Sequence, residues 1–270
     1  MNKIDIIIPL HKFDDSMADL FGRCYATADD MIRNTAPEDF DARIVLVGPE
    51  KVMDDAVHYL QEKNYNAINT LNNDKETDFC TQVNEAVKES NADFFMVVEY
   101  DDVVNAKWLS MAKPYLEKRT KTSVFLPLIE AIDYTNKTEP FYINEIAWSN
   151  SFADDELGSL NLEHLKTFCN FNATGAIIRR NEFVKAGGLK PSIKLSFNYE
   201  LLLRMANLYG DVFVIPKVGY FHSVNVPGSL TTEYHKTMEK EEGSWWIELA
   251  LQEYHFKKDR KKTYEKSPEE

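Results

Sequence analysis

Residues 94–102 read Phe-Phe-Met-Val-Val-Glu-Tyr-Asp-Asp, an apolar run that ends abruptly in acidic side chains. An uninterrupted apolar run of this length predicts a strand that is buried on both faces, as in a parallel sheet. Open α/β sheets bind ligands at the carboxyl ends of such strands. Glu99 and Asp101 are two residues apart and point to the same side of an extended backbone, and Asp102 follows at the turn. The three carboxylates predict a site for a hard divalent cation; the alternative is that they only solvate the end of the strand.

The composition is that of a folded globular protein. Of 270 residues, 44% are hydrophobic and 12% are aromatic, which is enough for a buried core. The formal net charge of -13 disfavours non-specific binding to nucleic acid or to an anionic membrane. No apolar stretch predicts a transmembrane or secretory segment. Cys24, Cys80 and Cys169 have neither metal-ligand spacing nor the pattern of a disulfide framework, so we expect reduced thiols and a cytoplasmic location.

Strands and helices alternate along most of the chain. Such alternation predicts a mostly parallel, doubly wound α/β sheet. Residues 130–166 do not show this alternation, which is typical of an insertion that faces the substrate. The predicted strands are 4–9, 43–47, 67–71, 94–98, 123–128, 172–179 and 212–216, and the predicted helices are 17–33, 52–63, 78–90, 108–118, 182–186, 201–209 and 233–262.

We expect one domain at residues 1–232 and a C-terminal helical extension at residues 233–270, because no repeat or low-complexity linker divides the chain. Trp245 and Trp246 in the extension predict a helix that packs onto the domain or onto a second subunit of a homo-oligomer. An exposed aromatic shelf that stacks sugar rings is the alternative. The basic run at residues 257–262 is typical of a solvated helix end.

Several short segments are informative because of their order along the chain. They are Ile6-Ile7-Ile8-Pro9-Leu10-His11-Lys12, Asn84, Glu99-Tyr100-Asp101-Asp102, Gly187-Gly188-Leu189 and Leu201-Leu202-Leu203-Arg204. Each segment alone is a weak signal. Together the ordered set resembles the family 2 glycosyltransferases, which have the GT-A fold. The resemblance implies a GT-A α/β sheet, and it implies transfer of a sugar from a nucleoside-diphosphate sugar to an acceptor hydroxyl.

The resemblance also implies a role for the acidic cluster. In that family an Asp-any-Asp motif after the strand binds a divalent metal that bridges the two phosphates of the donor. Asp101, Asp102 and His222 are thereby expected to hold Mn²⁺ or Mg²⁺, which stabilises the leaving diphosphate. Glu99 stands where the family has Asp, and its longer side chain reaches the ribose or a metal-bound water instead.

The same resemblance assigns the contacts to the nucleotide sugar. Asp78 has a second possible role, which is to cap the helix that it precedes. The second strand ends in Gly48-Pro49 where the family has acids, one of which contacts uracil, so the chain lacks this contact to uridine. The resemblance still favours a UDP-sugar as donor. The residues expected to bind the nucleotide sugar are Pro9, Leu10, His11, Lys12, Asp78, Asn84, Glu99 and Tyr100.

The catalytic base is where the chain departs most from the resemblance. Inverting members have an acidic pair shortly before the helical Arg that corresponds here to Arg204, and counting back places Asn198 there. A carboxamide does not accept a proton at neutral pH. Three alternatives follow: Glu200 substitutes as base, an acid of the irregular region such as Asp154 or Asp155 does, or the chain is not an ordinary inverting enzyme.

A second class of function is a catalytically inactive GT-A scaffold that serves as a binding or structural component of an assembly. Asn198, the Gly48-Pro49 ending and the absence of an Arg before Asn84 all motivate this alternative. A nucleotidyltransferase is disfavoured because residues 10–15 contain no glycine. If the chain is an enzyme, its acceptor is a glycan, a protein or a modified DNA base, and the net charge disfavours the last of these.

Overall fold

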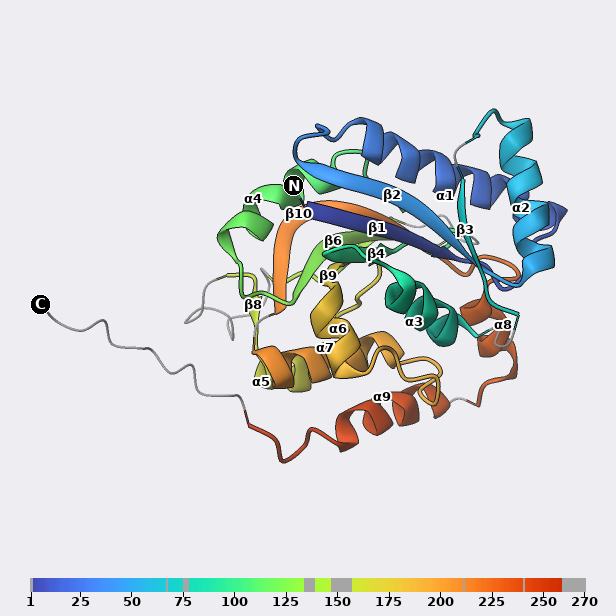
Figure 1. The fold of residues 1–270 in the computed structure, drawn as a ribbon. Coiled ribbons are helices and arrows are strands. Elements are labelled where there is room, and N and C mark those ends of the chain that lie inside the picture. The colour runs from blue at the N-terminus through green and yellow to red at the C-terminus, as the bar shows by residue number, and fades with distance from the viewer. Residues whose placement is uncertain are drawn as a thin grey trace, which may run out of the picture.

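The computed structural model has a sheet at its centre with helices on both faces (Figure 1). The sheet has 10 strands, and the predicted α/β class is confirmed. The residues that the structure describes are 2–66, 68–74, 78–133, 139–146, 157–210, 212–239 and 241–258.

The strands run in the order β3-β2-β1-β4-β9-β6-β10-β5, with β7 beside β6 and β8 beside β10. Long strands pair in parallel: β1 lies between β2 and β4, and β6 lies beside β10. The antiparallel pairs all involve the short strands β5, β7, β8 and β9. The bounds are β1 Asn2–Pro9, β2 Phe40–Gly48, β3 Asn69–Asn72, β4 Phe94–Val97, β5 Val103–Val104, β6 Val124–Asp133, β7 Phe141–Ile143, β8 Ser159–Leu160, β9 Ile177–Arg179 and β10 Val212–Val224.

Two apolar clusters form the core, one on each face of the sheet. Helices α1, α2 and α4 cover one face, and α3, α5, α6 and α7 cover the other (Figure 1). Continuous apolar strands such as β1 contribute alternate side chains to both clusters. The helices are α1 Asp15–Arg33, α2 Glu50–Glu62, α3 Phe79–Glu89, α4 Trp108–Lys118, α5 Leu162–Thr167, α6 Arg180–Ala186, α7 Phe197–Tyr209, α8 Leu230–Thr237 and α9 Glu242–Gln252.

The parallel pairing brings the functional residues to one edge of the sheet. Ile7 of β1 is in register with Val97 of β4, so both strands end at the same level. The chain following β1 and the acidic residues following β4 therefore meet at the carboxyl edge.

Three predicted elements differ in extent from the observed ones. The strand predicted at 172–179 is confined to β9, because Gly175 has φ +71 and turns the chain just before it. The strand predicted at 212–216 continues to Val224; Pro216 marks only a register shift against β6. Residues 130–166 contain the end of β6 together with β7, β8 and α5, and part of this stretch lies outside the described residues.

The C-terminal extension is two helices rather than the one predicted at 233–262. Helix α8 begins at Leu230, before the expected boundary, and α9 lies along the outside of α7 (Figure 1). Trp246 and Tyr254 are buried, whereas the Trp245 side chain is 54% exposed. Helix α9 thus packs against α7. None of the described helices is long and apolar enough to cross a membrane.

Candidate functional site

The acidic cluster lies at the carboxyl end of β4, as the sequence predicts. Oxygen atoms of Glu99, Asp101 and Asp102 all lie within 4.8 Å of one another. Asp101 is 5% exposed and Asp102 is 1% exposed. Among the described residues this is the one group of carboxylate, thiol or imidazole side chains close enough to hold a metal. Three clustered hard oxygen donors fit Mn²⁺ or Mg²⁺.

The backbone of Glu99 is fixed from both sides. Its N–H donates to the hydroxyl oxygen of Tyr220 at 3.0 Å, and Tyr220, on β10, is fully buried. Its carbonyl accepts from the Asp102 N–H at 3.0 Å and from the Cys24 thiol at 3.3 Å. Strand β10, helix α1 and the turn after β4 therefore hold the cluster together.

Burial and repulsion between neighbouring charges raise the pKa of Glu99 and of Asp101. Burial first, then Asp102 and Glu99, raise the pKa of Asp101 to about 8. Burial first, then Asp102, also raise the pKa of Glu99, while His222 and Thr174 partly offset this rise. Like charges at this spacing destabilise one another unless a cation lies between them. The site is thus arranged to favour a bound cation.

Asp102 links the cluster to β10. Its Oδ2 lies 2.9 Å from His222 Nδ1, and its Oδ1 accepts the Ser223 N–H at 2.8 Å. Burial lowers the pKa of His222, but Asp102, Glu99 and Asp101 outweigh it and raise the pKa to about 9. Because Nδ1 faces Asp102, the other ring nitrogen of His222, Nε2, is available to a ligand.

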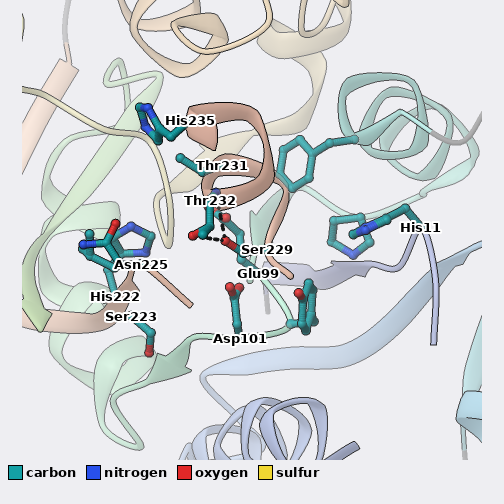
Figure 2. A pocket seen from close by; sticks show the side chains of 14 residues that line it. His11, Glu99, Asp101, His222, Ser223, Asn225, Ser229, Thr231, Thr232 and His235 are labelled. Atoms are coloured by element: carbon teal, nitrogen blue, oxygen red, sulfur yellow. Dashed lines mark hydrogen bonds between the residues drawn. The ribbon is translucent and has the colours of Figure 1, made fainter. Parts of the chain in front are cut away.

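A pocket opens above the cluster. Figure 2 shows Glu99 and Asp101 facing helix α8 across this pocket, with His222 and Asn225 on one side and His11 on the other. Helix α8 begins with a cap, in which the Ser229 side chain accepts the Thr232 N–H. The lining residues are Pro9, His11, Phe79, Glu99, Tyr100, Asp101, His222, Ser223, Val224, Asn225, Ser229, Thr231, Thr232 and His235.

In the segment after β1, His11 lines the pocket and Leu10 belongs to the core. His11 lines the pocket beside Tyr100, with ring centroids 6.2 Å apart, and burial followed by the charge of Lys12 lowers the His11 pKa. Leu10 is fully buried and donates its N–H to Val47, so its role is structural. The ammonium of Lys12 lies beside Gly228, where an added Cβ would meet it at 3.4 Å.

Two predicted contact residues have structural partners instead. Asp78 caps α3 by accepting the Thr81 N–H at 3.0 Å. The Asn84 carboxamide accepts the Leu189 N–H at 2.7 Å and donates to the Leu189 carbonyl at 2.8 Å. Neither side chain lines the pocket. Their expected contact with a nucleotide sugar does not fit this placement, because their polar atoms are engaged in holding α3.

Glu200 does not fit the expected role of catalytic base. Its carboxylate is 1% exposed and pairs with Arg204 at 2.7 Å and with Lys190 at 2.8 Å. The Tyr254 hydroxyl donates to it at 3.0 Å. A carboxylate held by these three donors, away from the pocket lining, serves to fasten α7 to the segment that follows α9. Asp154 and Asp155 lie outside the described residues.

Asn198 lies nearer the cluster than Glu200 does. Its Nδ2 donates to Asn172 Oδ1 at 2.9 Å and lies 3.4 Å from the Thr174 hydroxyl, which in turn contacts Glu99. As a carboxamide that donates a hydrogen bond, Asn198 is not a proton acceptor.

Several residues of the site were missed by the sequence reasoning. Phe79, Asn225, Thr232 and His235 line the pocket, and Tyr220 supports it. The sequence Ser229-Leu-Thr-Thr carries the one usable signal, because Ser followed by a helical stretch predicts a capped helix start.

Comparison by sequence finds no protein family and no curated protein that matches this chain. Comparison of structures finds S. aureus TarS. TarS 1–349 in complex with UDP-GlcNAc matches with a TM-score of 0.62 and 14% identity over 93% of this chain and 66% of that one. TarS 1–349 alone matches with a TM-score of 0.57 and 14% identity over 93% and 65%.

The complex of TarS 1–349 with UDP gives a TM-score of 0.56 and 13% identity over 92% and 79%. This chain therefore spans slightly less than two thirds of the first two TarS structures. At such low identity the likeness establishes the fold alone. The chain has the α/β fold of these GT-A structures, as its ordered motifs predicted.

Proposed function

We propose that this protein is a metal-dependent glycosyltransferase that moves a sugar from a nucleoside-diphosphate sugar to an acceptor hydroxyl. The observation that carries the proposal is the cluster of Glu99, Asp101 and Asp102 in a pocket at the carboxyl edge of a GT-A-like sheet. The TarS structures with UDP-GlcNAc and UDP support the choice of donor class.

The groups around the carboxylate cluster suit a diphosphate. The chain has 6 histidines and a net charge of -13, yet His11, His222 and His235 all line this pocket. Lys12 lies beside Gly228, just before α8. The N-terminus of a helix also favours anions. Histidine side chains beside the carboxylate cluster, with the Lys12 ammonium near the start of α8, suit the binding of a metal diphosphate.

The residues have separate roles in this proposal. Glu99, Asp101 and Asp102 would hold Mn²⁺ or Mg²⁺, which would neutralise the charge that develops on the leaving diphosphate. Each carboxylate oxygen of Asp102 makes one hydrogen bond within the protein and keeps a lone pair for a cation. His222 would donate its Nε2–H to a phosphate, or would bind the metal through Nε2 after losing that proton.

His11 and Tyr100 form the side of the pocket where we place the nucleoside. We favour UDP-sugars as donors. The missing acid after β2 has a structural reason: a Cβ at Gly48 would lie 2.2 Å from the Leu10 carbonyl oxygen, so no side chain fits there. Other groups of the protein would have to contact the uracil base.

The acceptor is a glycan, a protein or a modified DNA base, and the net charge favours the first two. We further propose a cytoplasmic location, supported by cysteines that are all free. A homo-oligomer through α9 is supported by the exposure of Trp245.

A second candidate function is a GT-A scaffold that binds the donor without turnover. The observation that favours it is the absence of a suitable base at two predicted positions: Asn198 is a hydrogen-bond donor and Glu200 is ion-paired in the interior. The two candidates differ in turnover and share metal and nucleotide binding.

The test incubates the protein with Mn²⁺ and a panel of radiolabelled nucleotide sugars, and it measures donor binding, donor hydrolysis and transfer. The glycosyltransferase proposal expects turnover that EDTA abolishes and that Asp101→Ala removes. Asp54→Ala is the matched control, because Asp54 is an exposed acid on α2. Binding without turnover of any donor would support the scaffold, and no binding at all would overturn both candidates.

A further inference from the structure

The side chain of Glu99 is oriented by a polar loop that lies before β9. The Thr174 hydroxyl oxygen is 3.0 Å from Glu99 Oε1. The same oxygen is 2.9 Å from Asn172 Oδ1. A hydroxyl donates one proton, so the two acceptors compete for it. Which of them receives the proton decides whether Glu99 has a hydrogen-bond donor.

Asn172 has no lone pair left for that proton. Its Oδ1 accepts the backbone N–H of Thr174 at 2.9 Å and the side-chain N–H of Asn198 at 2.9 Å. A carboxamide oxygen has two lone pairs, and these two donors fill them. The Thr174 hydroxyl is therefore directed to Glu99. Asn198, in the first turn of α7, sets the direction of the hydrogen bond.

Asn172 is itself held by a second asparagine. Asn144, which is fully buried, accepts the Asn172 N–H at 2.8 Å and donates to the Asn172 carbonyl at 2.9 Å. The second N–H of the Asn144 carboxamide donates to the Pro127 carbonyl at 2.9 Å. Asn144 thus ties the loop to β6, and the chain of hydrogen bonds that reaches Glu99 starts from a strand inside the sheet.

We propose that Asn198 and Thr174 form a relay that orients the Glu99 carboxylate for metal binding. Both are positioning residues: Thr174 contacts Glu99 directly, and Asn198 acts through Thr174 and Asn172. The inference rests on the proposed metal site. It gives the carboxamide at position 198 a function that a carboxylate would not serve, because a carboxylate has no N–H to donate to Asn172.

The test measures the affinity of the purified chain for Mn²⁺ from the electron paramagnetic resonance signal of the free ion. Thr174→Val preserves shape and removes the hydroxyl, and Asn198→Ala removes the N–H that fills Asn172. Residues that orient metal ligands typically contribute a factor of about 10–100 to metal affinity, so both variants should bind Mn²⁺ about 10-fold more weakly. Thr174→Ser retains the hydroxyl and should bind as the wild type does.

A matched control separates this effect from general loss of stability. Tyr199 is a buried residue of α7 whose hydroxyl donates to the Leu165 carbonyl at 2.6 Å, away from the acidic cluster. Tyr199→Phe should lower the melting temperature and leave Mn²⁺ affinity unchanged. Wild-type affinity in Thr174→Val or in Asn198→Ala would overturn the relay alone. Failure of the wild type to bind Mn²⁺ would overturn the metal site, and with it both the relay and the proposed function.

Discussion

His222 Nδ1 and Asp102 Oδ2 lie 2.9 Å apart and join the end of β10 to the turn after β4. Asp102 is 1% exposed, and its other carboxylate oxygen accepts the Ser223 N–H. Both of its carboxylate oxygens are therefore held by hydrogen bonds. These two strand ends are far apart in the sequence and form one wall of the pocket together. The ion pair therefore couples the shape of the site to the protonation of His222.

The first prediction concerns stability and pH in the absence of metal. The folded-state pKa of His222, about 9, lies above its ordinary value of 6.5. A raised pKa contributes stability that is fully present below pH 6.5 and is lost as the pH rises through 9. The melting temperature in EDTA should fall over this interval. His222→Gln should flatten the fall, and an equal fall in that variant would contradict the assignment.

The second prediction concerns metal affinity and pH. The pKa of Asp101 is about 8, so binding of a cation below that pH must displace a proton. Mn²⁺ affinity should rise by up to about tenfold per pH unit between pH 6 and pH 8 if one proton is released. Titrations at three pH values test this. If the Mn²⁺ affinity did not change with pH, Asp101 would not be a ligand that loses a proton when the cation binds.

The third prediction concerns Asp101→Asn. The substitution removes one of three mutually repelling buried carboxylates. At pH 8 it should stabilise the metal-free protein by on the order of 1–3 kcal/mol, and it should abolish the stabilisation by Mn²⁺. Urea denaturation with and without Mn²⁺ measures both effects. Asp54→Asn, at an exposed position of α2, should change neither.

The fourth prediction concerns Glu200. Glu200→Gln leaves Arg204 without its buried partner and should cost about 3–5 kcal/mol of stability. Mn²⁺ affinity should stay within error of the wild type, because Glu200 does not line the pocket. Glu62→Gln breaks only an exposed pair with His58 and should cost less than about 1 kcal/mol. Loss of transfer activity in Glu200→Gln at unchanged stability would instead restore Glu200 as a catalytic base.

The fifth prediction concerns the backbone of Glu99. Tyr220→Phe removes the acceptor of the Glu99 N–H and leaves a buried donor unpaired, at a cost of about 1–3 kcal/mol. It should also weaken Mn²⁺ binding, because the turn that carries the ligands loses a support. Tyr199→Phe should lower stability without this second effect. Equal Mn²⁺ affinity in the two variants would show that Tyr220 only fills space.

Much of the fold could be predicted from local pattern. β1, β2 and β4 each contain an apolar run followed by polar or turn-forming residues, so their existence and the place of the acidic cluster follow from the sequence. The extent of β9 could not be predicted, because the apolar pattern of residues 172–179 does not reveal the turn at Gly175. The full length of β10 depends on pairing with β6, which local pattern does not contain.

Part of the candidate site could likewise be predicted from the sequence, and part could not. The acidic cluster was identified from its position at a strand end and His11 from the family resemblance, and the structure brings Glu99, Asp101 and His11 to the pocket. The interior placement of Glu200 could not be predicted, because its partner Tyr254 is 54 residues away in sequence. The Thr174 contact with Glu99 spans 75 residues and carries no motif. Side-chain pairing across such separations is decided by packing, which a single sequence does not encode locally.

The central claim is that the carboxylate cluster and its pocket bind a nucleoside diphosphate through a divalent cation. Isothermal titration of UDP into the protein, once with Mn²⁺ and once with EDTA, tests it most directly. We predict binding with Mn²⁺, binding at least about 10-fold weaker in EDTA, and no effect of Mn²⁺ in Asp101→Ala. Equal UDP affinity with and without Mn²⁺, or no UDP binding in either condition, would contradict the account.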